Sequence, residues 1–213
     1  MKGRHLRPLY QRIRAQLPSL AIKGPLLFEQ PIGDVLHGVF CESSAFSKDR
    51  FFVWVFVQPL YVPRSEITLT FGERVGGNSR TWSMEPSEVD ELTESLLGRA
   101  PEFWNRYGSA ALLIDCAKEL VGDSSHIGLQ EAVALSLALV GQDARAKVAL
   151  DRLQAQVRQI SEQPPWLAEA LARWNALEAC LGARSAAHDV LVSWRADTLH
   201  ALGLGRSAMD PKA

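Results

Sequence analysis

The chain has 213 residues, enough for one large domain or two small ones with a well-buried core. Hydrophobic residues make up 47% and charged residues 22%, the proportions of an ordinary globular protein. The formal net charge of −1 gives no global field that would favour nucleic acid or a membrane surface. The longest apolar run falls far short of the roughly 20 residues that a membrane-spanning helix needs. The basic start has no apolar core after it, so we expect no secretory signal there.

The three cysteines are widely spaced: Cys41, Cys116 and Cys180. No C-x-x-C pair exists, so the sequence predicts neither a disulfide framework nor a structural zinc site. We therefore expect a protein of the reducing cytoplasm.

The N-terminal segment carries apolar residues at helical spacing, at Leu6, Leu9, Ile13 and Leu17. Three arginines lie away from that stripe: Arg7, Arg12 and Arg14. This pattern predicts an amphipathic helix that ends at Pro18. The proline- and glycine-rich segment 18–34 that follows is expected to be a connector or an irregular edge.

A run of strands comes next. Residues 35–41, 51–57 and 66–71 have strand character, and the last of these alternates cleanly between apolar residues and threonine. Gly76-Gly77-Asn78 predicts a hairpin turn into a fourth strand at 80–84. No helical pattern lies between these strands, so the sequence predicts an antiparallel meander of about four strands.

From Pro86 onward the patterns are helical. Ser87 is the expected N-cap of a helix with Val89, Leu92 and Leu96 on its buried side, ending near Gly98. Further helical segments are expected from Pro101 and over residues 110–121, 127–140, 146–160, 166–181 and 185–202. Residues 127–140 are apolar nearly all round, which predicts a central, covered helix.

These elements predict an α+β fold: an N-terminal helix and antiparallel meander, followed by a helical bundle or a stack of helical hairpins. The expected organisation is a helix-plus-sheet domain over residues 1–84, an all-helical region over 85–205 and a flexible tail over 206–213.

Two helical segments match each other. ALVGQDARAKVALDRL from Ala138 and ACLGARSAAHDVLVSW from Ala179 align without a gap at a period of 41 residues, the difference between positions 182 and 141. Both predict helix, glycine-containing turn, helix. They resemble the helical-hairpin unit of tetratricopeptide-type repeats, although the usual period is about 34 residues. Such a repeat implies protein binding rather than chemistry.

The sequence predicts no cofactor or metal site. His37 and Cys41 share a strand face but lie roughly 13 Å apart, too far to hold one metal ion. No histidine has a helical i, i+4 partner, and neither a G-x-S-x-G elbow nor a phosphate-binding loop is present. The enzyme alternative requires an active site assembled from distant acids and a histidine, such as His37 or His126.

The strand at 51–57 is apolar on both faces. Phe52, Trp54 and Phe56 form an aromatic row on one of them. The favoured interpretation is that helices of the same chain cover this row. The alternative is an exposed contact surface for a partner. Tyr61, held between prolines on the loop that follows, is a second candidate contact.

Charge is unevenly distributed. Residues 1–23 carry six bases and no acid, while residues 85–94 carry five acids and no base. Two solvated helix faces are the favoured interpretation. Alternatively, the basic segment contacts phosphate through Arg7, Arg12 and Arg14, or docks on the acidic helix of the same chain. Glu88, Glu91 and Glu94 are candidate contacts for a basic partner protein.

The run FVQPLYVP…ITLTFGERVGG resembles small uncharacterised bacterial α+β proteins, some of which are found with toxins as immunity proteins. The resemblance implies a non-catalytic bacterial protein that binds another protein. It identifies no functional residues in this sequence. We therefore expect an immunity or adaptor protein that sequesters a protein partner, with nucleic acid as a minor alternative and the oligomeric state left open.

Overall fold

The computed structural model describes residues 6–45, 47–116, 119, 126–160 and 164–205. The chain folds into two compact units. The first, the sheet unit, takes its described residues from 6–58 and 67–108. The second, the helical unit, takes them from 59–66 and 109–205.

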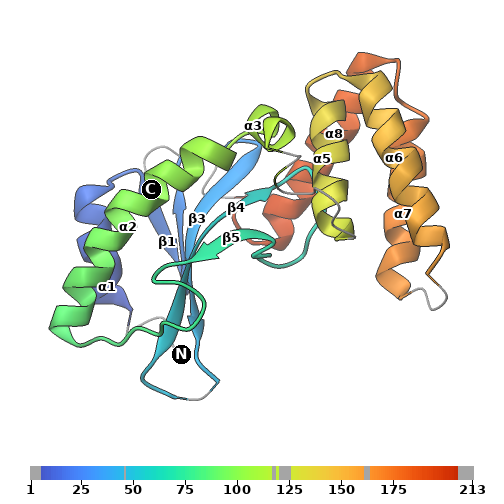
Figure 1. Cartoon of the computed structure of the whole chain (residues 1–213). Helices are drawn as coiled ribbons and strands as arrows, with labels where there is room; N and C mark the ends of the chain where they lie inside the picture. The colour runs from blue at the N-terminus through green and yellow to red at the C-terminus, as the bar shows by residue number, and fades with distance from the viewer. Residues whose placement is uncertain (1–5, 46, 117–118, 120–125, 161–163, 206–213) are drawn as a thin grey trace. The chain divides into compact units, whose positions relative to one another are not determined.

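The sheet unit is built on a five-stranded antiparallel sheet with the strands in chain order (Figure 1). The strands are β1 (Leu20–Lys23), β2 (Leu26–Glu29), β3 (Val35–Ser43), β4 (Phe51–Pro59) and β5 (Phe71–Arg74). The predicted α+β class and antiparallel meander are confirmed.

The first hairpin was not expected. Residues 20–29, predicted to be a connector, form β1 and β2, which pair with Leu20 opposite Glu29. Gly24 makes the turn with a φ of 57°, a conformation that favours glycine. The prolines of this segment flank the two short strands instead of interrupting them, so they do not prevent pairing.

The last strand begins later than its alternating pattern predicts. Residues 66–70 are not in a strand, and β5 covers 71–74, with Phe71 opposite Val57. The Gln58 side chain accepts a hydrogen bond from the Thr68 backbone N–H at 2.9 Å. The predicted turn at Gly76 and Gly77 is present, with φ values of 87° and 86°.

The predicted strand at 80–84 is reduced to a single bridge. Trp82 pairs with Phe51 of β4, beyond the part of β4 that faces β5. The Phe51 and Trp82 backbones exchange two hydrogen bonds, of 2.9 and 2.8 Å. The segment after the turn therefore ties to β4 instead of extending the hairpin.

Two helices pack against each other on one face of the sheet, α1 (Arg7–Gln16) and α2 (Pro86–Tyr107) (Figure 1). The prediction that a helix ends near Gly98 and another starts at Pro101 was wrong, because α2 runs through both residues. Its buried stripe continues past the predicted end to Ala100 and Trp104. Pro101 removes one backbone hydrogen bond, and the packed stripe maintains the helix.

The helical unit contains α3 (Ala110–Asp115), α5 (Ile127–Leu139), α6 (Asp143–Arg158), α7 (Pro165–Glu178) and α8 (Arg184–Ala201). Helix α5 packs with α3, α6 and α8, as the prediction of a central helix requires. Gly141 and Gly182 lie in the turns before α6 and α8 with positive φ. Both matching segments are thus helix, glycine turn, helix, and their likeness to tetratricopeptide repeats stays a prediction.

The segment 59–66 belongs to the helical unit, so this unit is not continuous in sequence. Leu60, Tyr61 and Val62 are all buried. The Tyr61 hydroxyl lies 2.5 Å from Ser136 Oγ of α5. The observed units therefore divide the chain differently from the expected boundary at residue 84, because α2 lies with the sheet and 59–66 with the helices.

Replacing Tyr61 should test its place in the core. We expect Tyr61→Ala to lower the free energy of unfolding by about 3–5 kcal/mol, because it leaves a cavity. Tyr61→Phe, the matched variant, keeps the ring and should cost only about 1 kcal/mol. Urea unfolding of the full chain measures both values, and equal effects of the two variants would contradict this assignment.

Candidate functional site

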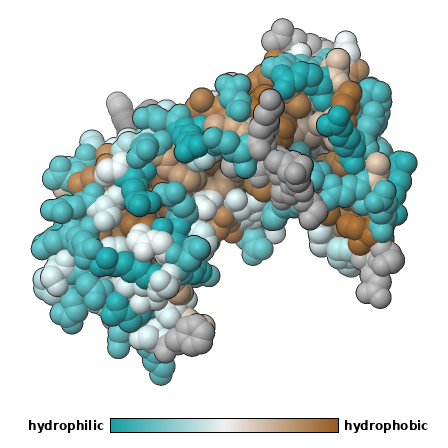
Figure 2. All heavy atoms as spheres, viewed as in Figure 1, coloured by the Kyte–Doolittle hydropathy of each residue, from teal (hydrophilic) through white to brown (hydrophobic). Residues whose placement is uncertain are grey.

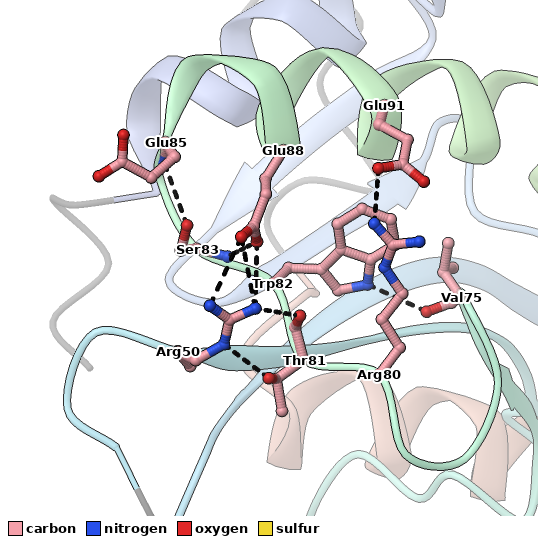
Figure 3. Close-up of polar contacts among 9 residues, drawn as sticks. All are labelled: Arg50, Val75, Arg80, Thr81, Trp82, Ser83, Glu85, Glu88 and Glu91. Atoms are coloured by element: carbon pink, nitrogen blue, oxygen red, sulfur yellow. Dashed lines mark hydrogen bonds and ion pairs between the residues drawn. The ribbon is translucent and has the colours of Figure 1, made fainter.

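Glu88 lies at the start of α2 and points toward the sheet (Figure 3). Its Oε2 accepts a hydrogen bond from the Ser83 backbone N–H at 2.7 Å and lies 3.3 Å from an Arg50 nitrogen. Arg50 also donates to the hydroxyl and the carbonyl of Thr81, both at 2.7 Å. Glu88 therefore anchors the chain that leads into α2, and its role as a partner contact stays a prediction.

The next acids of α2 are also paired within the sheet unit. Glu91 accepts a hydrogen bond from Arg80 at 2.5 Å, and the Arg80 guanidinium lies 4.0 Å from the centre of the Trp82 ring (Figure 3). Asp90 forms an ion pair with Arg12 of α1. This pair, together with the packing of α1 on α2, is the docking of the basic helix on the acidic helix that the charge distribution allowed.

The pairing changes which charges remain for a partner. Glu94 is exposed and forms no ion pair among the described residues. Arg7 and Arg14 are likewise exposed, while Arg12 is occupied. Figure 2 shows mainly hydrophilic side chains over this helix-covered face of the sheet unit. The nucleic-acid hypothesis stays a prediction that depends on Arg7 and Arg14.

The aromatic row of β4 is divided between the interior and the surface. Phe56 is fully buried, which excludes it as a partner contact in this structure. Its ring packs against Gly38, where any added Cβ would overlap it, and its Cβ lies beside Gly72. Phe52 and Trp54 are only partly buried. The glycines at these two positions of β3 and β5 leave the space that the Phe56 ring and Cβ occupy.

Arg74 lies over the two partly exposed rings. Its guanidinium carbon is 4.0 Å from the centre of the Phe52 ring and 4.7 Å from that of Trp54. Glu42 accepts a hydrogen bond from the Trp54 indole at 2.9 Å and lies 3.7 Å from Arg74. We call these four residues the aromatic–arginine cluster. A planar guanidinium over aromatic faces is a favourable cation–π arrangement.

The strand register shows which face of the sheet carries this cluster. Trp54 is opposite Arg74, so both side chains lie on one face. Val55 and Glu73 form the next pair and lie on the other face, where Glu73 forms an ion pair with Arg99 of α2. The cluster therefore lies on the face of the sheet opposite α2.

Tyr61 is not available as a contact residue. Only 1% of it is exposed, and its hydroxyl is paired with Ser136, whose own hydroxyl donates to the Ala132 carbonyl at 2.7 Å. The two prolines around Tyr61 do hold an ordered loop, but the loop packs into the helical unit. Its interpretation as a recognition residue is corrected by this burial.

His37 contacts an acid of the neighbouring strand β2. Its Nδ1 lies 2.6 Å from Glu29 Oε2, and its Nε2 lies 2.8 Å from the Gly108 carbonyl oxygen. The ring stacks on Trp104, with centroids 5.8 Å apart. A backbone carbonyl occupies the second ring nitrogen in this structure, and the enzyme alternative stays a prediction. Sequence reasoning missed Glu29 because β2 was not expected.

His126 has a local role. It is the N-cap of α5, and its Nδ1 accepts a hydrogen bond from the Leu129 backbone N–H at 3.3 Å. This contact satisfies one of the unpaired N–H groups at the helix start. The serine-rich turn before it lies outside the described residues.

Cys41 is unsuited to nucleophilic chemistry. It is buried in β3, and burial raises its pKa to about 12. Burial also raises the pKa of neighbouring Tyr10, whose hydroxyl donates to the Pro25 carbonyl at 2.8 Å. The thiolate is the reactive form, so a raised pKa keeps Cys41 inert. No group of three potential metal ligands occurs among the described residues.

A buried carboxylate in α5 was also missed. Glu131 is only 1% exposed, and its oxygens accept hydrogen bonds from Arg64 at 2.6 Å and the Trp174 indole at 2.9 Å. An Arg173 nitrogen lies 3.9 Å away. A buried charge is tolerated only when it is paired and hydrogen-bonded, so this cluster joins segment 59–66 to α5 and α7.

Two glutamates of α2 provide a matched test of the structural role. We expect Glu88→Gln to lower the free energy of unfolding by about 1–2 kcal/mol, because it removes the Arg50 pair and weakens the bond from Ser83. Glu94→Gln, on the same helix, should change it by less than about 0.5 kcal/mol. Urea unfolding distinguishes them, and similar losses for both would contradict the assignment.

Cys41 should make the protein less stable at high pH. The native thiol has the raised pKa, so the unfolded chain ionises first and stability falls as pH rises from about 9 toward 12. The slope from this group approaches about 1.4 kcal/mol per pH unit. Urea unfolding between pH 8 and 10 should show that slope for the parent chain and for Cys180→Ala. Cys41→Val should lack it, and a Cys41→Val slope equal to that of the parent would refute the assignment.

Comparison with families of known proteins, with curated proteins and with solved structures finds no match to this chain. The resemblance to immunity proteins therefore stays a prediction. Among the described residues, no helix is both long and apolar enough to cross a membrane.

Proposed function

We propose that this protein acts without catalysis by binding another protein through the aromatic–arginine cluster. The observation that carries the proposal is the pair of partly exposed rings, Phe52 and Trp54, beneath Arg74 on the sheet face opposite α2. Aromatic residues and arginine are enriched in protein interfaces and dominate their binding energy. Partly exposed aromatic pairs on a sheet face often mark a contact surface.

The cluster is also held rigid before any partner binds. β4 is paired on both sides, by β3 and by β5. Glu42 fixes the Trp54 indole, and the Asn78 carbonyl accepts a hydrogen bond from Arg74 at 2.8 Å. A surface whose side chains are already ordered loses less conformational entropy on association.

Other features support the same class of function. The paired helix–glycine–helix segments of the helical unit are typical of proteins that present binding surfaces. The resemblance to immunity proteins gives the proposal a specific form, a bacterial protein that sequesters its partner. We place it in the cytoplasm, since all three cysteines carry thiols rather than disulfides.

The acidic face contributes less to this proposal than its sequence suggested. Glu88 and Glu91 are occupied within the sheet unit, and Glu94 remains as the available contact among the three. Charge at the rim of an interface mainly affects the rate of association. Glu94 is therefore assigned to steering and the cluster to affinity.

Affinity capture from the native lysate tests the proposal. The tagged parent chain should retain a stoichiometric protein partner after nuclease treatment, and the Phe52→Ser/Trp54→Ser variant should lose at least about 90% of it, because two anchor rings are removed. Partner identity comes from mass spectrometry. Urea unfolding of the variant checks that loss of capture is not loss of folding.

The matched control is Trp166→Ser, which removes a half-exposed tryptophan of the helical unit, where 50% of the residue is accessible. It should capture the partner as well as the parent chain does. Equal capture by the double variant would sink the choice of surface. Capture of nucleic acid alone, lost when Arg7 and Arg14 become Glu, would instead support the minor alternative.

A further inference from the structure

The end of α2 is the point where the chain leaves the sheet unit. Gly108 is the last residue of that unit, and Ser109 is the first of the helical segment that follows. The Gly108 N–H bonds to the Trp104 carbonyl at 2.7 Å and closes the helix. Its own carbonyl is bound by His37 from β3 at 2.8 Å. The His37 side chain therefore holds the last residue of the sheet unit, after which the chain continues into the helical unit.

The two contacts of His37 require an extra proton. A backbone carbonyl can only accept a hydrogen bond, and an ionised carboxylate can only accept as well, whereas a neutral imidazole has one N–H. Both ring nitrogens lie within hydrogen-bond distance of such acceptors, Glu29 at 2.6 Å and Gly108 at 2.8 Å. Both bonds form together only when the ring is an imidazolium opposite the Glu29 carboxylate.

The surroundings are shaped to hold the ring in this position. The Trp104 ring stacks on His37 with an angle of 14° between the planes. Any Cβ at position 108 would overlap both His37 Nε2 and the Trp104 carbonyl oxygen, so only glycine permits the approach. A cation at the C-terminal end of a helix is also favoured by the helix dipole.

Glu29 is the charged group that contacts the His37 ring. From β2 the facing group is Glu29, and from α2 the facing groups are the Trp104 ring and the Gly108 carbonyl. Arg106, the basic residue in the last turn of α2, has its guanidinium 5.3 Å from the centre of the Tyr107 ring. The His37 side chain is 21% exposed, so it can exchange protons with water.

We propose that His37 is a proton-dependent latch: the protonated ring holds the Gly108 carbonyl at the end of α2, and the neutral ring releases it. The protonated ring joins β2, β3 and the end of α2. When it loses one proton, the remaining N–H stays with the Glu29 carboxylate, because a hydrogen bond to a charged acceptor is stronger than one to a carbonyl. The Nε2 lone pair then faces the Gly108 oxygen and releases the helix end. Histidine is the side chain that most readily gains or loses a proton under physiological conditions. It does not depend on the proposed partner binding.

The test uses the full chain and two readouts over a pH series. Long-range ¹H–¹⁵N spectra of the ring count its N–H groups, and hydrogen exchange followed by mass spectrometry measures protection at residues 104–109. After correction for intrinsic exchange, protection should fall by about tenfold as the ring loses its second N–H. Exchange within α5, residues 131–138, should stay unchanged and serves as the internal reference.

Two variants and a control complete the test. His37→Gln should show low protection at 104–109 with no dependence on pH, while His188→Gln, an exposed histidine on α8, should behave as the parent chain. If His37→Gln also loosens α5, Glu29→Gln takes its place. Without the carboxylate that holds the last ring N–H, this N–H can stay on the Gly108 carbonyl, so protection at 104–109 should no longer depend on pH. Two results would overturn the proposal. One is a His37 ring with a single N–H throughout the pH series, and the other is protection at residues 104–109 that stays constant while the ring changes protonation.

Discussion

Strand β4 must have both of its faces shielded from water, and the sheet unit is arranged around that requirement. Phe51, Val53, Val55 and Val57 are buried on the face that α1 and α2 cover. On the other face Phe56 is enclosed where the neighbouring strands carry glycine, and the two remaining rings lie under Arg74. An arginine shields aromatic surface while its charge stays in contact with water, so this end of the sheet remains accessible to a partner.

The acidic residues at the start of α2 are used mainly to hold the sheet unit together. The acids at the start of α2 are matched by arginines from α1, from the start of β4 and from the loop before α2, so most of their field is neutralised locally. Glu88 in particular holds the backbone at Ser83. A cluster of acids that lacks bases in sequence is therefore not an unpaired cluster in space, and the balance of the proposed function moves from the acidic helix to the sheet face.

Polar contacts also mark where the chain passes between its two units. Gln58 and Thr68 lie beside the two ends of segment 59–66 and are hydrogen-bonded to each other. His37 contacts Gly108, the last residue of the sheet unit before the helical segment that starts at Ser109. Within the helical unit, the buried Glu131 and Ser136 hold segment 59–66 through Arg64 and Tyr61. Buried polar groups need specific partners, whereas apolar packing accepts many arrangements, so these contacts determine which segments belong together.

The sequence by itself determined the elements that have a local signature. Helices α1, α5, α6, α7 and α8 follow from apolar periodicity, β3 and β4 from strand composition, and the turns at Gly76 and Gly141 from glycine. Only the tertiary structure decided that α2 continues through Pro101, that β1 and β2 pair, and that Tyr61 is buried. The physical reason is distance along the chain: Tyr61 lies 75 residues from Ser136, and His37 lies 71 residues from Gly108. Periodicity reports which side of an element is buried, but the groups that bury it or pair with it come from remote segments.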